Sequence, residues 1–227
     1  MKIVWIISIK EGGNIRTNSR VIKIDAEPDK VTVTLDDGTI FTAGSTVISA
    51  GAWSGDLLQQ LNLDLPLNPI RKTFAWYEIN EELYNENKFP GFAFQLEEKN
   101  YYGFPSIDGA RLKIGRHDGG ETIHPDEERT IFGDVPGDKE DLNNFLRTYM
   151  PLVGQLKFGK TCMYTMTPDE DFIIDVHPLY KNIAIAAGFS GHGFKFASAV
   201  GETLSELVTK GSTKLDISPF SIKRFIK

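Results

Sequence analysis

The sequence predicts an α+β or α/β protein with two lobes, and three observations support this prediction. Residues 14 to 50 alternate apolar and polar side chains, and residues 70 to 120 contain further strand-like stretches between short polar turns. Residues 138 to 150 carry apolar side chains at helical spacing. Residues 172 to 210 resemble two strands, a glycine-rich turn and a helix. A strand-rich region between two mixed regions indicates separate lobes.

The bulk composition excludes several classes of protein. The chain has 227 residues, of which 41% are hydrophobic and 25% charged, which is ordinary for one large or two small globular domains. A net charge of -6 argues against a nucleic-acid partner, and no apolar run approaches the roughly 20 residues of a membrane span. Cys162 is the only cysteine, so no intramolecular disulfide can form and we expect a cytoplasmic protein.

The first third of the chain is predicted to be mainly strands. The apolar run in the opening "MKIVWIISIK" is too short for a signal peptide. The segment favours a strand, or the remainder of a truncated start. Val31, Val33 and Leu35 alternate with polar residues, and Asp37-Gly38 supplies a hairpin turn. Ser54 is predicted to cap a helix over 55–61, and two prolines end that unit.

The remaining elements follow from their apolar spacing. Strands are expected within 72–79, 91–98, 100–107, 110–117, 172–177 and 182–187. The helix at 138–150 has Asp138 as its expected cap, and Leu142, Phe145, Leu146 and Tyr149 make one face of it. A last helix ends near Lys210, and the tail is expected to be irregular.

The stretch "AAGFSGHGFKFASAVGETLSEL" is the first candidate site. Gly188, Gly191 and Gly193 allow a backbone to approach a ligand, and the helix that follows offers free N–H groups and partial positive charge. Together with Lys195, this turn suits a carboxylate or a delocalised anion. The alternative is an ordinary strand-to-helix turn with a solvated lysine.

The strand "RLKIGRH" is the second candidate. Side chains two residues apart share a face, so Lys113 and His117 can line one pocket, with a cation beside a group that titrates near neutral pH. The alternative is an exposed basic face. Tyr101 and Tyr102 must point to opposite faces of their strand, so one ring can face a pocket, unless both simply pack.

Cys162 is the third candidate. A lone cysteine is most often a small apolar residue, but a stabilised thiolate serves as a nucleophile or attachment point. No recognisable metal-ligand spacing accompanies it, so no metal site is predicted.

Several long stretches resemble one family. They are "VISAGAWSGDLLQQLNLDLPLNP", "YYGFPS", "LKIGRHDGG", "CMYTMTPDEDFIIDVHP" and "IAAGFSGHGFKFASAVGETLSEL", in that order. They are similar to the monomeric sarcosine oxidase and N-methyltryptophan oxidase group, flavin amine oxidases related to D-amino-acid oxidase. The resemblance implies oxidation of the secondary amine of an N-methyl amino acid to an imine, with oxygen reduced to hydrogen peroxide.

The resemblance also implies a role for each matching residue. Cys162 would carry FAD through a thioether bond, and Lys113 would promote the reaction with oxygen. Tyr102 and His117 would line the substrate pocket, and Lys195 would help bind the substrate carboxylate.

The same resemblance divides the chain into three parts. Residues 1–69 and 161–227 would belong to an FAD-binding domain, and 70–160 would form an antiparallel substrate domain. The remaining cofactor-binding residues it implies are Tyr164, Gly191, His192 and Gly193, again with Lys195.

One departure from the family bears on activity. The family's Gly-x-Gly-x-x-Gly motif is not found in this sequence, so we expect impaired FAD binding and impaired oxidase activity. An inactive remnant, or half of a split oxidase that needs a partner chain, is the alternative. A second copy of the chain covering exposed sheet edges would also meet the need for a partner. An enzyme that uses Cys162 as a nucleophile without flavin has the least support.

Overall fold

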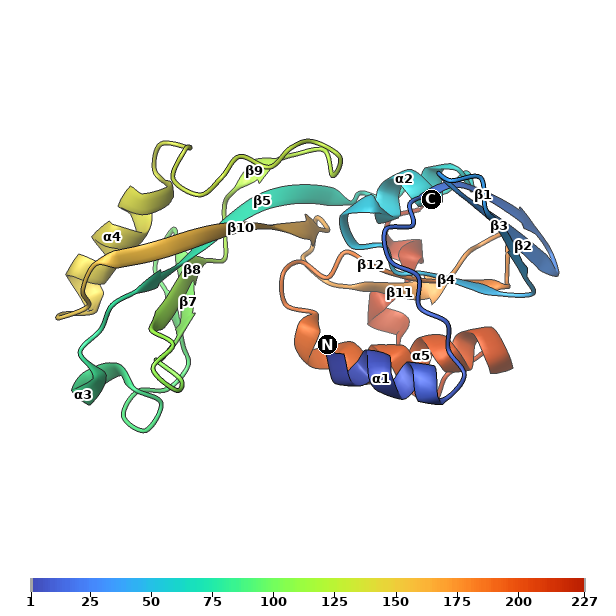
Figure 1. Ribbon diagram of the computed structural model, residues 1–227. Helices are drawn as coiled ribbons and strands as arrows, with labels where there is room; N and C mark the ends of the chain where they lie inside the picture. Colours follow the sequence, from blue (N-terminus) through green and yellow to red (C-terminus); the bar gives the residue numbers. More distant parts are fainter. Residues whose placement is uncertain (1, 227) are drawn as a thin grey trace.

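The computed structural model describes residues 2–226, and its elements form two lobes joined by two long strands. Strands β5 (Asn68–Tyr77) and β10 (Leu156–Met166) run antiparallel from one lobe into the other (Figure 1). The predicted mixture of α and β structure in two lobes is therefore confirmed. Among the described residues, no helix has both the length and the apolar character that a membrane crossing needs.

The first lobe is an antiparallel sheet covered on one face by a helix. Its strand order is β10-β5-β8-β7-β6, with the short β9 also paired to β5. The further bounds are β6 Phe92–Gln95, β7 Asn100–Phe104, β8 Leu112–Arg116 and β9 Glu121–Thr122, with α3 at Glu81–Tyr84 and α4 at Asp138–Tyr149. Leu142, Phe145 and Leu146 of α4 pack on Tyr101 and Ile114 of the sheet.

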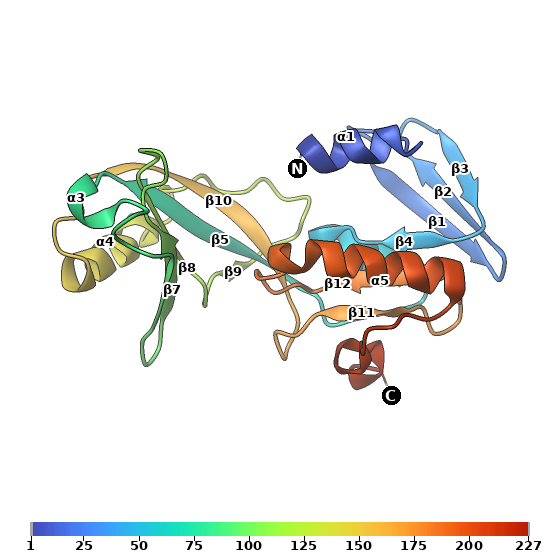
Figure 2. The same ribbon diagram turned by 90° about the horizontal axis from the view of Figure 1, so that it is seen from below.

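The second lobe holds two three-stranded sheets. One contains β1 Val21–Glu27, β2 Lys30–Leu35 and β3 Ile40–Ala43, and the other has the order β11-β12-β4, with β4 Thr46–Ile48, β11 Ile173–Val176 and β12 Ile183–Ala187. Helix α5 (Ala197–Lys210) lies along the second of these sheets (Figure 2) and contributes Leu204 and Leu207 to its core. Helix α2 spans Ser54–Gln59.

The opening segment is a helix, so the predicted strand is wrong. Helix α1 covers Lys2–Lys10, and its side chains from Val4 (67% exposed) to Ile9 (58% exposed) lie largely in solvent. The β-branched run favoured a strand, but a strand needs a neighbour for its hydrogen bonds, whereas a helix satisfies its backbone groups locally.

Both predicted helix caps are also wrong. The N-cap of α2 is Trp53, after a 3₁₀ turn (η1, Gly51–Trp53), and the buried Ser54 hydroxyl accepts a hydrogen bond from the Ala50 N–H at 3.2 Å. The N-cap of α4 is Gly137. The carboxylate of Asp138 points instead towards the sheet, because it binds a buried cation on β5.

That cation is Arg71, whose guanidinium donates to both oxygens of Asp138 at 3.0 and 2.7 Å. The two side chains are only 6% and 7% exposed. Burial raises the pKa of Asp138, but hydrogen bonds from Arg71 and the Gly133 N–H lower it more, so its pKa lies below the ordinary value. The pair fastens the start of α4 to the middle of β5.

Replacing Asp138 by Asn should lower the free energy of unfolding by about 3 kcal/mol, because the buried guanidinium would lose its counter-charge. Urea unfolding followed by circular dichroism measures this loss. Glu140→Gln, an exposed change in the same helical turn, is the matched control and should have little effect.

The loss should also depend on pH in a defined direction. A carboxyl with a lowered folded pKa stabilises the protein fully above its unfolded pKa of about 4, and this contribution fades as the pH falls towards the folded pKa. The difference between parent and Asp138→Asn should therefore shrink below about pH 4. A difference that stays constant into acid would contradict this assignment of the pair.

Candidate functional site

One face of the first-lobe sheet gathers most of the predicted site residues. In the strand register, Cys162 lies opposite Lys72, Trp76 opposite Lys113, and Gly115 opposite Tyr102. Directly paired residues point to the same side of a sheet, and residues two apart share that side. The sheet site face, as we name it, therefore carries Lys72, Tyr102, Lys113, His117, Cys162 and Tyr164. The opposite face is the core beneath α4.

Three aromatic side chains converge on this face. The His117 ring centroid lies 5.6 Å from that of Tyr164 and 6.4 Å from that of Tyr102. The Tyr164 hydroxyl donates to the Tyr102 hydroxyl oxygen at 3.4 Å. Gly115 makes this possible, because a Cβ there would sit 3.0 Å from the Tyr102 ring. Tyr101 points the other way and stacks on Phe145, with ring centroids 4.2 Å apart.

Lys113 sits among aromatic rings. Its ammonium group lies 4.4 Å from the Phe74 ring centroid, 5.5 Å from that of Trp76 and 6.0 Å from that of Phe104. Contacts of this kind hold a cation by the quadrupole of each ring, without a carboxylate to neutralise its charge. The positive charge therefore stays available on the sheet site face.

The glycine turn lies directly against this face. The Ser190 N–H donates to the Thr165 carbonyl at 3.0 Å, which ties the turn to the end of β10. Gly191 has φ +82°, and a Cβ there would lie 2.1 Å from Cε2 of Tyr164. The Tyr164 ring thus occupies the space that a side chain at position 191 would take. His192 reaches the same cluster, with its ring centroid 6.4 Å from that of His117.

Lys195 and Gly193 lie elsewhere on the turn. Lys195 belongs to a 3₁₀ turn (η2, Phe194–Phe196), is exposed, and lies over the Phe196 ring at 5.2 Å. Helix α5 begins at Ala197, so the 3₁₀ turn separates its N-terminus from the glycines. Gly193 packs closely on Phe189, because a Cβ at position 193 would lie 2.5 Å from Cδ1 of the Phe189 ring.

Burial sets the protonation of the site residues. It lowers the pKa of His117, helped by the positive charge of Lys72, which favours a neutral imidazole. It raises the pKa of Tyr102, so the phenol stays protonated. It also raises the pKa of the Cys162 thiol, against the opposing charges of Lys113 and Lys72.

Lys72 is the residue that the sequence analysis missed. It is only 5% exposed, and its ammonium lies 5.3 Å from the Tyr164 ring centroid. A signal was present, because in the strand "KTFAWYEI" the residues Lys72, Phe74 and Trp76 alternate onto one face. The cross-strand pairing with Cys162 was not accessible without the register.

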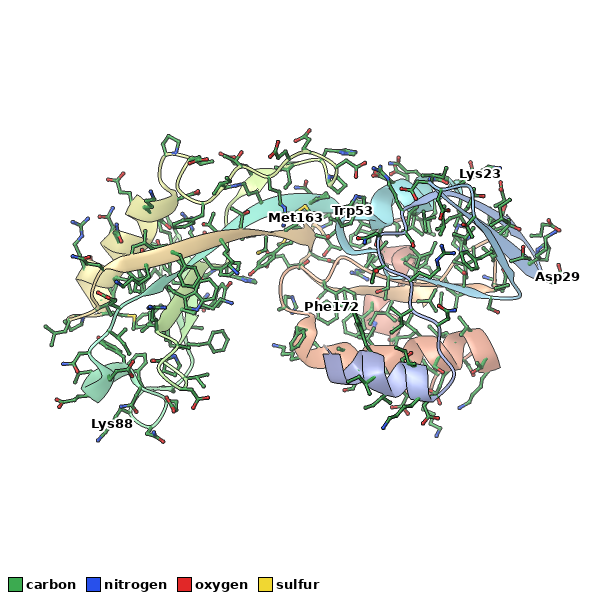
Figure 3. The ribbon with its side chains drawn as sticks, in the orientation of Figure 1. Lys23, Asp29, Trp53, Lys88, Met163 and Phe172 are labelled. Atoms are coloured by element: carbon green, nitrogen blue, oxygen red, sulfur yellow. The ribbon has the colours of Figure 1, made fainter. Side chains whose placement is uncertain are left out.

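A cavity of about 450 Å³ lies where the lobes meet. It is lined by residues of the Gly51–Trp53 turn, of β10 and of the glycine turn, including Tyr164 and Gly191. Trp53 and Met163, which both line it, lie at the middle of the molecule (Figure 3). Within residues 2–226, no cluster of three His, Cys, Asp or Glu side chains is arranged to hold a metal ion.

The sequence model of the family described as DAO, FAD dependent oxidoreductase, matches residues 8–207. The chain belongs to this family. It is 47% identical over 215 residues to a monomeric sarcosine oxidase from Bacillus sp. (strain NS-129), covering 94% of this chain and 55% of the relative. It is 40% identical over 223 residues to an N-methyl-L-tryptophan oxidase from Escherichia coli (strain SMS-3-5 / SECEC), covering 97% of this chain and 58% of the relative. The chain thus spans about half the length of the curated relatives it matches.

Solved structures of the same fold are more distant in sequence. The structure of NikD, titled an unusual amino acid oxidase essential for nikkomycin biosynthesis, has a TM-score of 0.82 at 21% identity, covering 97% of this chain and 58% of that chain. L-proline dehydrogenase from P. horikoshii has a TM-score of 0.79 at 22% identity, covering 97% of this chain and 57% of that chain. These likenesses show the fold.

The residues on and beside the sheet site face fit a flavin ring. Cys162 offers a half-buried thiol, and Gly191 brings bare backbone to the face. Lys72 and Lys113 suit a ring that gains negative charge on reduction. Phe194, 86% exposed, and Phe196, 41% exposed, present apolar surface beside the turn that a planar ring can cover.

Gly191→Ala should displace the Tyr164 ring and destabilise the chain more than a matched change elsewhere. Gly211→Ala is the control, because Gly211 has φ +73° but nothing within 4 Å of its would-be Cβ. Backbone strain alone should cost about 1 kcal/mol at Gly211, and the clash should add about 2 kcal/mol at Gly191. Urea unfolding measures both losses.

A double-mutant cycle identifies the clash. In a Tyr164→Ala background, Gly191→Ala should cost no more than Gly211→Ala, because the obstructing ring is gone. Equal losses for the two glycine variants in the parent background would refute the proposed contact.

Proposed function

We propose that the sheet site face and the glycine turn form the flavin and substrate face of an amine oxidase that acts on N-methyl amino acids. The observation that supports it most is the convergence of Cys162, Lys113, His117 and Tyr102 on one sheet face, beneath the glycine turn. Two relatives are named for different substrates, sarcosine and N-methyl-L-tryptophan, and both of these are N-methyl amino acids.

Bound FAD would supply the two-electron oxidation of the amine to an imine, with the electrons passing to oxygen to give hydrogen peroxide. Cys162 is the residue we assign to covalent attachment, because its thiol is the only one in the chain and it faces the site. Tyr164, Gly191, His192 and Gly193 would contact the ring from the side of the turn.

The substrate would be held by His117 and Tyr102. A neutral imidazole accepts a hydrogen bond or a proton from an amine N–H, and burial keeps His117 neutral. The protonated Tyr102 hydroxyl can donate to a substrate carboxylate. Lys195 would add charge for the same carboxylate, provided that its exposed side chain turns inwards from Phe196.

Lys113 would favour the reaction with oxygen. Negative charge develops on oxygen as it accepts electrons, and a nearby fixed cation stabilises that charge. The aromatic rings beside Lys113 hold its ammonium group without a carboxylate, so its positive charge is available to the oxygen.

A partner chain is the second arrangement we propose, because apolar surface is exposed in the second lobe. Within the described strands, β4 has a neighbour on one side only, and its Val47 is 42% exposed. Ile40 and Phe41 of β3 are 62% and 45% exposed. Open strand edges and apolar patches favour association with another polypeptide, which would complete the flavin site.

Expression with FAD followed by acid precipitation tests the flavin assignment. Any flavin that the parent chain binds, alone or with a partner polypeptide, should stay in the pellet, whereas Cys162→Ser should release it to the supernatant, because only a covalent bond survives denaturation. A parent chain that yields no flavin, alone or with an added partner polypeptide, would contradict the proposed function. Flavin that appears only with the partner would support the two-chain arrangement.

Lys113→Met should slow the reaction of the reduced protein with oxygen by about 10²-fold to 10³-fold, the effect typical of removing a preorganised electrostatic contact. Lys160→Met is the matched control, because Lys160 lies 5.9 Å from the same Trp76 ring but is exposed. Stopped-flow reoxidation after anaerobic reduction by sarcosine or N-methyl-L-tryptophan measures the rate. Equal rates in the two variants would remove Lys113 from this role.

A further inference from the structure

Lys72 is a buried cation in the middle of β5. Its side chain is almost fully removed from solvent, with 5% exposed, and points onto the sheet site face opposite Cys162. Its ammonium donates to the carbonyl oxygen of Asp118 at 2.6 Å and to that of Gly119 at 2.8 Å. These partners are main-chain carbonyls, so they satisfy its hydrogen bonds without neutralising its charge.

The carboxylate of Asp118 is engaged by other groups. It accepts hydrogen bonds from Nε of Arg116 at 2.9 Å and from the Asn100 N–H at 2.5 Å. Lys72 therefore binds the backbone of the turn while the acid of that turn is directed to Arg116. The turn follows His117 directly, and the His117 N–H donates to the Asn100 carbonyl at 2.7 Å. The ammonium and this hydrogen bond fix the backbone on both sides of the imidazole.

We propose that Lys72 is a positioning residue of the site: it holds His117 in place through the turn at Asp118 and Gly119, and it supplies a second positive charge beside Cys162. The identity of the site as a flavin site rests on the proposed function. The effect of Lys72 on its two neighbours does not, because it follows from contacts within the chain.

The charges around Lys72 define the direction of that effect. Its positive charge opposes protonation of His117 and favours the thiolate of Cys162, in the same sense as Lys113 at the thiol. Asp118 and Glu170 act in the opposite sense on His117, and His192 acts with Lys72. Burial lowers the pKa of Lys72 itself to about 8, so the charge is present at neutral pH and is lost in mild alkali.

Two substitutions separate the charge from the hydrogen bonds. Lys72→Gln removes the charge but keeps a side-chain amide donor, whereas Lys72→Met removes both and keeps an unbranched side chain of similar length. Lys160→Met, on the exposed part of the same face, removes a positive charge without touching the turn and is the control.

The first measurement is the rate of alkylation of Cys162 by iodoacetamide at about pH 7, read by mass spectrometry on the chain without FAD. The single cysteine makes the product unambiguous. Both Lys72 variants should react about threefold to tenfold more slowly than the parent, the change that corresponds to about half to one unit in the thiol pKa. Lys160→Met should react at the parent rate.

The second measurement is the titration of His117 followed by NMR. Its midpoint should move to higher pH in both Lys72 variants, because a neighbouring positive charge has been removed. Slow hydrogen exchange of the His117 amide should persist in Lys72→Gln and be lost in Lys72→Met.

Parent-like alkylation and an unmoved His117 titration in a folded Lys72→Gln would overturn the charge role. Unchanged amide exchange in Lys72→Met would overturn the positioning role. Should Lys72→Met fail to fold, Lys72→Gln alone decides the charge role, and faster amide exchange in a Lys72→Ala variant decides the other. None of these three measurements uses flavin or amine, so failure to bind FAD would refute the proposed function without changing their outcomes.

Discussion

The pairing of β5 with β10 is the interaction on which the rest of the structure depends. The two strands stay in antiparallel contact over almost their whole length and connect the lobes (Figure 1). Because side chains alternate between faces, this one register decides which residues enter the core beneath α4 and which form the site. A slip of one residue would turn Cys162 towards the helix and bring Met163 to the face that now carries the tyrosines and lysines.

The core side explains why the register holds. Ala75 and Tyr77 of β5 are almost fully buried, and the Tyr77 hydroxyl donates to Asn143 of α4 at 2.9 Å. Arg71 can meet Asp138 only from that same side. A shifted strand would bury Lys72 beneath α4 and expose these groups, so the penalty for slippage includes both lost packing and an unpaired buried charge. Packing on the α4 side therefore fixes the register that positions the side chains of the sheet site face.

The sequence carried enough information for most strands between residues 14 and 120 and for those at 172–187, for the hairpin at Gly38 and for the alternation that unites Lys113 with His117, because each depends on local spacing. It did not predict β10, the long strand that pairs with β5. It did not reveal the features that depend on partners distant in the chain. Asp138 is a residue type that often caps helices, but its carboxylate pairs with Arg71, which is distant in the sequence. Lys72 resembles any lysine at the edge of a strand until its partner Cys162, 90 positions later, is placed opposite it. The strand predicted for the opening segment was wrong for a related reason, since β-branched residues favour a strand only where another strand is available to pair.

Arg71 and Lys72 show how one strand treats positive charge in two ways. They are consecutive and almost equally buried, at 6% and 5% exposure, yet they point to opposite faces. Arg71, on the structural side, is neutralised by a bidentate carboxylate. Lys72, on the site side, donates to carbonyl oxygens, and Lys113 nearby lies against aromatic rings. Burying an unneutralised cation such as Lys72 costs stability, so its place beside a second, half-buried cation, Lys113, is difficult to explain by folding alone. Both cations are expected where a negative charge forms during function, and a ring that accepts electrons beside Cys162 would provide one.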